Sequence, residues 1–222
     1  MTERGMIFNA EMVRALLDGR KTQTRRIMKV QPVLNGNFYE VFGSAWSKGM
    51  TSIPAVPGHS LSTRCPFGAV GDRIWVREGF FPAPLEMQSE PPRKTMWNIA
   101  YRDGMQMEKL APAEYNPTIY NYERWTPSIH MPRWASRILL EITDVRVERL
   151  NAISEEDARA EGIIDGGCLN CGEPEPCGCA NPEPDATDAF AYLWQSIYGQ
   201  ENWNTNPWVW VIEFKRVEGG AA

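Results

Sequence analysis

The chain has 222 residues, of which 43% are hydrophobic and 23% are charged. A chain of this length can bury enough surface to fold without disulfides, and its composition excludes a disordered, collagen-like or coiled-coil protein. The formal net charge is −5, but ten acidic residues and one basic residue lie in residues 155–188, so that the rest of the chain holds 22 basic and 18 acidic residues. Because residues 19–39 contain no acid at all, an anionic partner is not excluded.

The sequence shows neither a membrane span nor a secretory signal. No stretch approaches the ~20 consecutive apolar residues of a membrane span, and the first residues lack the apolar segment of a secretory signal. We therefore expect a cytoplasmic protein without a membrane partner.

The first half of the chain predicts one helix and two strands. Apolar residues recur at helical spacing between Asn9, a candidate N-cap, and Gly19, a candidate C-terminal stop. Residues 30–70 are rich in Pro, Gly, Ser and Asn and are interpreted as a long irregular loop, which in a compact domain is usually functional or an insertion. A short strand is expected at 73–78 and another at 97–102.

The second half predicts two further strands and two helices. Apolar residues alternate from 137 to 149, with a change of parity at residues 143–144 that indicates a bulge or a turn. A capping box predicts a short helix over 154–162, and apolar spacing predicts an amphipathic helix over 190–197. In residues 208–215, the large apolar side chains of Trp208, Trp210, Ile212 and Phe214 alternate with Val209, Val211, Glu213 and Lys215, which is typical of a strand.

A few strands with short helices and no βαβ rhythm predict a mixed α+β fold built around a small β-barrel. We expect residues 1–222 to form a single domain. It would carry three insertions, at about residues 30–65, 82–125 and 165–185.

Four of the five cysteines, Cys168, Cys171, Cys177 and Cys179, lie within twelve residues among several glycines. In a reducing compartment, clustered thiols favour metal binding over disulfides. Four thiolates complete the tetrahedral coordination of Zn²⁺ and leave no position for water, so the expected ion is structural. Reduced, unliganded thiols or redox disulfides are the alternatives. The fifth, Cys65, is interpreted as a packing residue.

Catalytic motifs based on histidine or on a phosphate-binding loop are not recognisable in the sequence. The two histidines, His59 and His130, have no obvious Ser or Cys partner nearby in sequence. Neither a Gly-x-x-x-x-Gly-Lys-Ser/Thr loop nor a Gly-x-Gly-x-x-Gly motif is found. Any catalysis would therefore depend on Lys, Thr and carboxylate side chains.

Three segments carry a family resemblance: 17–26 (LDGRKTQTRR), 71–78 (GDRIWVRE) and the terminal strand 209–214 (VWVIEF). Together they resemble the ASCH domains of the PUA-like superfamily, and in particular the larger versions encoded by bacteriophages and prophages. The Gly-x-Lys-Thr-x-Thr-x-Arg element in the first segment is the most specific part. Relative to the smallest ASCH proteins, the three expected insertions are extra, including the zinc knuckle with its four cysteines.

The resemblance implies a β-barrel with a cleft for RNA or a modified nucleoside. Some small ASCH proteins are amidohydrolases that remove the acetyl group of N4-acetylcytidine, and their reaction depends on a Lys, a Thr and a Glu. Lys21 and Thr24 match the first two positions, and Glu161, on the expected helix 154–162, matches the third. In this hypothesis Thr24 supplies a hydroxyl nucleophile and Lys21 is its base if burial and nearby arginines lower its pKa. Glu161 shuttles a proton or holds Lys21 in place.

Six further residues are candidates for contacts with substrate or nucleic acid. Glu78 ends a predicted strand and is an alternative carboxylate for catalysis. Trp134 is a candidate for base stacking, although anchoring a turn is an equal alternative for it. The complete predicted binding set is Arg20, Arg25, Arg26, Arg77, Glu78 and Trp134.

The expected partner is thus RNA or a modified nucleoside, and the expected cofactor is a structural zinc ion. Two other functions fit the same residues. The first is a non-catalytic nucleic-acid-binding module of a phage, and the second is a ribonuclease for single strands that uses Arg and Lys to stabilise phosphate charge.

Overall fold

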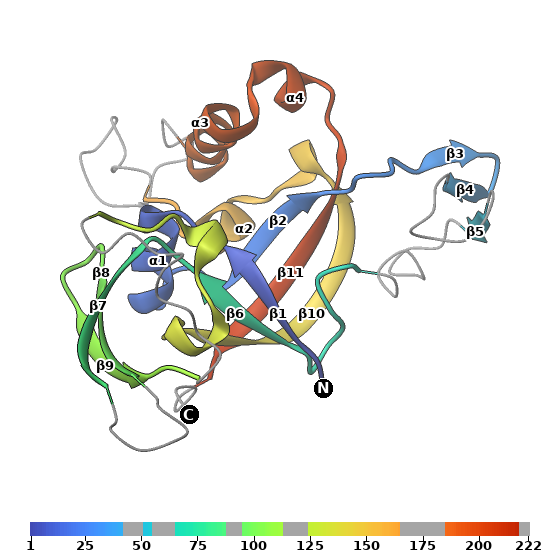
Figure 1. The fold of residues 1–222 in the computed structure, drawn as a ribbon. Coiled ribbons are helices and arrows are strands. Elements are labelled where there is room, and N and C mark those ends of the chain that lie inside the picture. The colour runs from blue at the N-terminus through green and yellow to red at the C-terminus, as the bar shows by residue number, and fades with distance from the viewer. Residues whose placement is uncertain (42–50, 55–64, 88–94, 113–123, 165–184, 218–222) are drawn as a thin grey trace. The chain divides into compact units, whose positions relative to one another are not determined.

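A computed structural model describes residues 1–41, 51–54, 65–87, 95–112, 124–164 and 185–217 (Figure 1). Helices and strands mix in both halves of the chain, which confirms the predicted mixed α+β class. The helices are α1 (Ala10–Leu17), α2 (Glu155–Ala160), α3 (Ala186–Tyr198) and α4 (Gln200–Asn204), with 3-10 turns at Ser128–His130, Arg133–Ala135 and Leu150–Ala152. The strands are β1 (Glu3–Ile7), β2 (Gln23–Ile27), β3 (Val33–Asn35), β4 (Phe38–Val41), β5 (Thr51–Pro54), β6 (Arg73–Arg77), β7 (Phe80–Met87), β8 (Thr95–Tyr101), β9 (Gln106–Leu110), β10 (Leu139–Arg149) and β11 (Trp208–Arg216).

The chain divides into two compact units, and β10 and β11 contribute residues to both. Unit 1 comprises residues 1–17, 72–141 and 215–222. In it, β1 runs parallel to β6, with Glu3 opposite Arg73, and the first residues of β10 pair antiparallel with β6. A second sheet has the order β7-β8-β9.

Unit 2 comprises residues 18–71 and 142–214. Its strands follow the order β10-β11-β2, and β11 pairs antiparallel with β2, with Ile212 opposite Thr24 (Figure 1). The short strands β3, β4 and β5 form an antiparallel sheet of their own.

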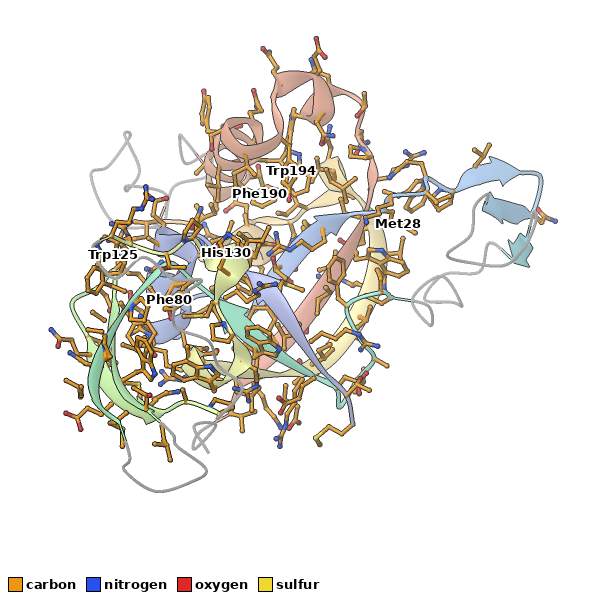
Figure 2. The ribbon with its side chains drawn as sticks, viewed as in Figure 1. Met28, Phe80, Trp125, His130, Phe190 and Trp194 are labelled. Carbon is orange, nitrogen blue, oxygen red and sulfur yellow. The ribbon has the colours of Figure 1, made fainter. Side chains whose placement is uncertain are left out.

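Each unit has its own buried apolar cluster. In unit 1 the cluster is centred on aromatic residues of β7 and β8, among them Phe80, Trp97 and Tyr101. In unit 2, Phe190 and Trp194 project from α3 (Figure 2). They belong to one buried cluster with Val209 and Val211 of β11. Burial of these side chains removes apolar surface from water and stabilises each unit.

The predicted helix starts are confirmed by their capping hydrogen bonds. The Asn9 side chain accepts from the Met12 amide at 2.8 Å, which starts α1, and the Ser154 hydroxyl accepts from the Asp157 amide at 3.1 Å, which starts α2. Each side-chain oxygen satisfies one of the amides that the first turn of a helix leaves unpaired. The predicted end of the long helix is also confirmed, since Gly199 follows α3 with φ of 86°.

Two local predictions differ from the structure. Residues 30–70 contain the three short strands β3, β4 and β5, so this segment is not irregular throughout. Strand β10 runs unbroken from Leu139 to Arg149, and Thr143 and Asp144 are two adjacent exposed residues within it. The parity change therefore takes place inside the strand, and a turn is wrong for this position.

The hydrogen bonding of the described strands closes no barrel. Among the described residues, no helix is long and apolar enough to cross a membrane.

Candidate functional site

Lys21 and Glu161 meet in unit 2. Lys21 forms an isolated antiparallel bridge with Glu161, which caps the C-terminal end of α2. The Thr22 amide donates to the Ala160 carbonyl at 2.8 Å and fixes this register. As a result, Lys21 Nζ lies 2.7 Å from Glu161 Oε2 and 2.8 Å from the Glu161 carbonyl oxygen.

This ion pair is sealed from solvent. The Lys21 side chain has no exposed surface, and 4% of the Glu161 side chain is exposed. Burial lowers the pKa of Lys21 below its ordinary value, while the charge and hydrogen bond of Glu161 act in the opposite direction. The positive charges of Arg26 and Arg25 lower that pKa further. An uncharged Lys21 amine is able to accept a proton.

Arg25 connects this pair to a wider network of carboxylates. Its guanidinium is fully buried, and Nη1 donates to Glu161 Oε1 at 3.4 Å. Nη2 donates to Asp157 at 2.9 Å and to Glu148 at 3.2 Å. The Arg25 guanidinium also lies 5.9 Å from the centre of the Phe190 ring. Arg25 therefore holds the Glu161 carboxylate through the oxygen that Lys21 does not contact.

Arg146 completes the network from β10. It donates to Glu148 at 2.6 Å and to Asp157 at 2.8 Å, and it also contacts Glu213. Burial raises the pKa of Asp157, but the charges and hydrogen bonds of Arg25 and Arg146 outweigh burial and lower this pKa overall. Arg25 and Arg146 thus share the carboxylates of Asp157 and Glu148, a partly buried arrangement that orients all of its members.

Thr24 lies in β2, next to Arg25, and is buried, with 2% exposure. Successive side chains of a strand point to opposite faces, and Gln23 and Arg25 both reach α2, through the Asp157 carbonyl and the Asp157 carboxylate respectively. The Thr24 side chain therefore points to the other face of β2. In the described part of the chain, the hydrogen bonds of Lys21 and Glu161 do not include the Thr24 hydroxyl.

Two other basic residues of the predicted binding set lie near this site in the sequence. Arg20 is partly exposed and donates to the Gly162 carbonyl at 2.8 Å and to Asp18 at 3.0 Å. Arg26 is half-buried. Arg25, by contrast, directs its guanidinium to carboxylates inside the protein. Roles of Arg20, Arg25 and Arg26 in substrate binding stay predictions.

The remaining predicted contacts belong to unit 1. Arg77 is half-buried over the Trp75 ring and donates to the Ile129 carbonyl. Trp134 is half-buried and packs against the apolar cluster of unit 1. This packing agrees with the alternative in which Trp134 anchors a turn, and its role in stacking stays a prediction.

Glu78 is buried at 3% exposure and pairs with an arginine that sequence reasoning missed. Arg137 donates to both Glu78 oxygens, at 2.9 and 2.8 Å, and to Asp103 at 2.8 Å. Its guanidinium also stacks 4.0 Å from the centre of the Tyr101 ring. The two partners are 59 residues apart in sequence, and no local pattern connects them.

The cysteine cluster 168–179 lies outside the described residues. Among the residues that are described, no group of three or more His, Cys, Asp and Glu side chains could hold a metal ion. Cys65, which is described, is partly buried and takes part in no disulfide. The zinc site stays a prediction.

No family model matches the chain, and no curated protein and no solved structure matches it.

Proposed function

We propose that the chain is a PUA-like, ASCH-type amidohydrolase that removes the acyl group from N4-acetylcytidine or a related nucleoside in the cytoplasm of a phage-infected or lysogenic cell. The observation that carries this proposal is the 2.7 Å contact between the buried Lys21 Nζ and Glu161 Oε2. A buried lysine of lowered pKa beside a carboxylate is an arrangement suited to proton transfer.

The proposed reaction consumes one water molecule. Neutral Lys21 takes a proton from the nucleophile, whose oxygen attacks the acetyl carbonyl carbon and forms a tetrahedral intermediate. Glu161 relays this proton from Lys21 to the exocyclic nitrogen of the base, the carbon–nitrogen bond breaks, and cytidine leaves. Acetate is the second product. Arg25 holds the other Glu161 oxygen, so the relaying carboxylate has a fixed orientation.

Two nucleophiles are compatible with this chemistry. The family resemblance proposes the Thr24 hydroxyl, which would form an acetyl-enzyme that water then hydrolyses. The alternation of side chains along β2 places Thr24 opposite Gln23 and Arg25, and this favours direct attack by water. Mass spectrometry of the protein during turnover distinguishes the two, because only the first path adds an acetyl group to Thr24.

The proposed reaction requires that the substrate reach Lys21. Because Lys21 has no exposed side-chain surface, substrate binding must open a path to its Nζ atom. The same full burial supports the second candidate, in which the pair only stabilises unit 2 and the protein binds nucleic acid without reaction.

The test follows the release of cytidine from N4-acetylcytidine by chromatography. Lys21→Met and Glu161→Gln remove the proposed base and relay with little change in side-chain volume. Lys29→Met, at an exposed position of the same unit, is the matched control. We expect the first two variants to lose at least about 100-fold in rate, the lower range for general acid–base catalysis, while the control keeps its rate. Thermal unfolding shows whether each variant is folded.

Absence of turnover above the Lys21→Met level in the unmodified chain would refute the amidohydrolase proposal. Salt-sensitive RNA binding without a product would then favour the binding module, and cleavage of single-stranded RNA would favour the ribonuclease.

A further inference from the structure

Unit 1 contains a pocket that is separate from the Lys21–Glu161 pair in sequence and in composition. Its cavity volume is about 30 Å³, and it opens to solvent. Residues of α1 line it, together with residues just before β7, just after β8 and just before β10. The lining residues are Ala10, Val13, Arg14, Glu78, Gly79, Arg102, Asp103 and Arg137.

The acidic groups of this pocket are already neutralised in part. Arg137 has 3% of its side chain exposed and donates to both oxygens of Glu78. It also binds Asp103 at 2.8 Å, and the other Asp103 oxygen accepts from the Met105 amide at 3.1 Å. Each nitrogen of the Arg137 guanidinium thus contacts a carboxylate, and its charge offsets one of the two carboxylates.

Arg102 and Arg14 provide two further positive charges. Arg102 lies 4.1 Å from the centre of the Trp125 ring, and the Phe81 ring packs against that ring in a T-shaped pair with 6.1 Å between centroids. An arginine stacked on an aromatic ring is oriented without the loss of its hydrogen-bond donors. Within the described residues, neither Arg102 nor Arg14 forms an ion pair with a carboxylate. The five charged groups of the pocket sum to a net positive charge.

We propose that this pocket binds a phosphate group through Arg102 and Arg14. Two guanidinium groups with available donors and a pocket of net positive charge suit the oxygens of a phosphate, since arginine forms paired, charge-assisted hydrogen bonds with phosphate. Arg137 belongs to the support of the site: it holds Glu78 and Asp103 in ion pairs, so that they repel the ligand less. This proposal does not depend on deacylation by Lys21 and Glu161, because the reaction proposed above assigns no role to any residue of this pocket.

The test is a titration with inorganic phosphate, followed through the backbone amide signal of Gly79 in two-dimensional NMR spectra. We expect a saturable shift of this signal. Arg102→Gln and Arg14→Gln change exposed side chains and should each weaken the phosphate affinity by about tenfold, as is typical for the loss of a charged hydrogen bond. Arg216→Gln, an exposed arginine of the same unit, should leave the affinity unchanged.

Two outcomes would overturn the proposal: a signal that does not saturate with phosphate, or a loss of affinity as large for Arg216→Gln as for Arg102→Gln. The source of the phosphate follows from short single-stranded RNAs with and without a 5′-phosphate. Preference for the 5′-phosphorylated RNA that Arg102→Gln abolishes supports a site for a terminal phosphate monoester. If Arg102→Gln lowers the affinity equally for the RNAs with and without a 5′-phosphate, this result supports contact with the RNA backbone.

Discussion

The substitution Arg25→Met tests whether the ion pairs of Arg25 with its carboxylates stabilise unit 2. The change keeps a long side chain beside Phe190 but removes the guanidinium that contacts Glu161, Asp157 and Glu148. All three carboxylates then lose a positive partner inside or at the edge of the protein. We expect the folded state to lose stability while the backbone of β2 stays in place.

The size of the loss follows from what each carboxylate retains. Removal of one partner from a buried ion pair costs about 3–5 kcal/mol. Asp157 and Glu148 keep Arg146, and their side chains are 21% and 26% exposed, which allows water to compensate in part. Glu161 keeps Lys21. The lower end of the range, about 3 kcal/mol, is therefore expected. It corresponds to a fall in melting temperature of roughly 6–12 °C for a chain of this length.

Chemical denaturation and thermal unfolding of the purified protein measure this loss. Arg4→Met is the control, because Arg4 forms an exposed ion pair with Asp72 at 3.4 Å and such pairs contribute about 1 kcal/mol or less. A double-mutant cycle with Glu161→Gln isolates the Arg25–Glu161 coupling. A loss for Arg25→Met no larger than that for Arg4→Met would show that the buried network does not stabilise unit 2.

Three other predictions concern packing, acid stability and metal content. Gly5→Ala places a Cβ atom 2.6 Å from Trp75 Cζ2, so its unfolding free energy should fall by about 1–3 kcal/mol; Gly79→Ala, whose nearest atoms lie at 3.7 Å, is the control, and equal melting temperatures for the two variants would contradict the close approach. Because the folded-state pKa of Asp157 is lowered from 3.8, its contribution to stability is present above this value and is lost as the pH falls through the lower folded-state pKa. Asp157→Asn should therefore flatten the acid limb of the stability curve, and an unchanged limb would count against the ion pairs of Asp157. Elemental analysis should find about one zinc ion per chain, which substitution of two of the cysteines 168–179 by serine removes; a metal-free native chain would exclude the zinc knuckle.

Apolar periodicity predicts the elements that bury one regular face. Helix α3 is of this kind, because Phe190 and Trp194 follow helical spacing. Strand β11 is also predicted in its place, but its four consecutive residues 209–212 are all buried, so this strand buries both of its faces. The short strand β1 contains Glu3, Arg4 and Gly5, and no periodic pattern indicates that it pairs with β6. Apolar periodicity does not predict strand β2 either, because its buried side chains, Gln23, Thr24 and Arg25, are polar or charged.

The polar residues of β2 show why the candidate site could be predicted only in part. Lys21 and Glu161 came from a family resemblance in two short segments, and the structure brings their side chains into contact. Asp157 and Glu148, whose carboxylates make the burial of Arg25 tolerable, lie more than 120 residues away from it in sequence. Glu78 and Arg137 illustrate the same limit in unit 1. Burial of a charge depends on a partner that the fold supplies, and no local pattern specifies this partner.

The central claim, that Lys21 is a buried amine able to act as a base, is tested most directly by NMR titration of the protein with isotope-labelled lysine. The Lys21 signal, assigned through the Lys21→Met variant, should titrate below 10.5, the ordinary lysine pKa, because burial outweighs the opposing effect of Glu161. The rate of deacylation should then rise with pH through the same value as the amine loses its proton. A Lys21 amine that titrates at or above 10.5 would be charged throughout the neutral range, and this result would contradict its role as the base.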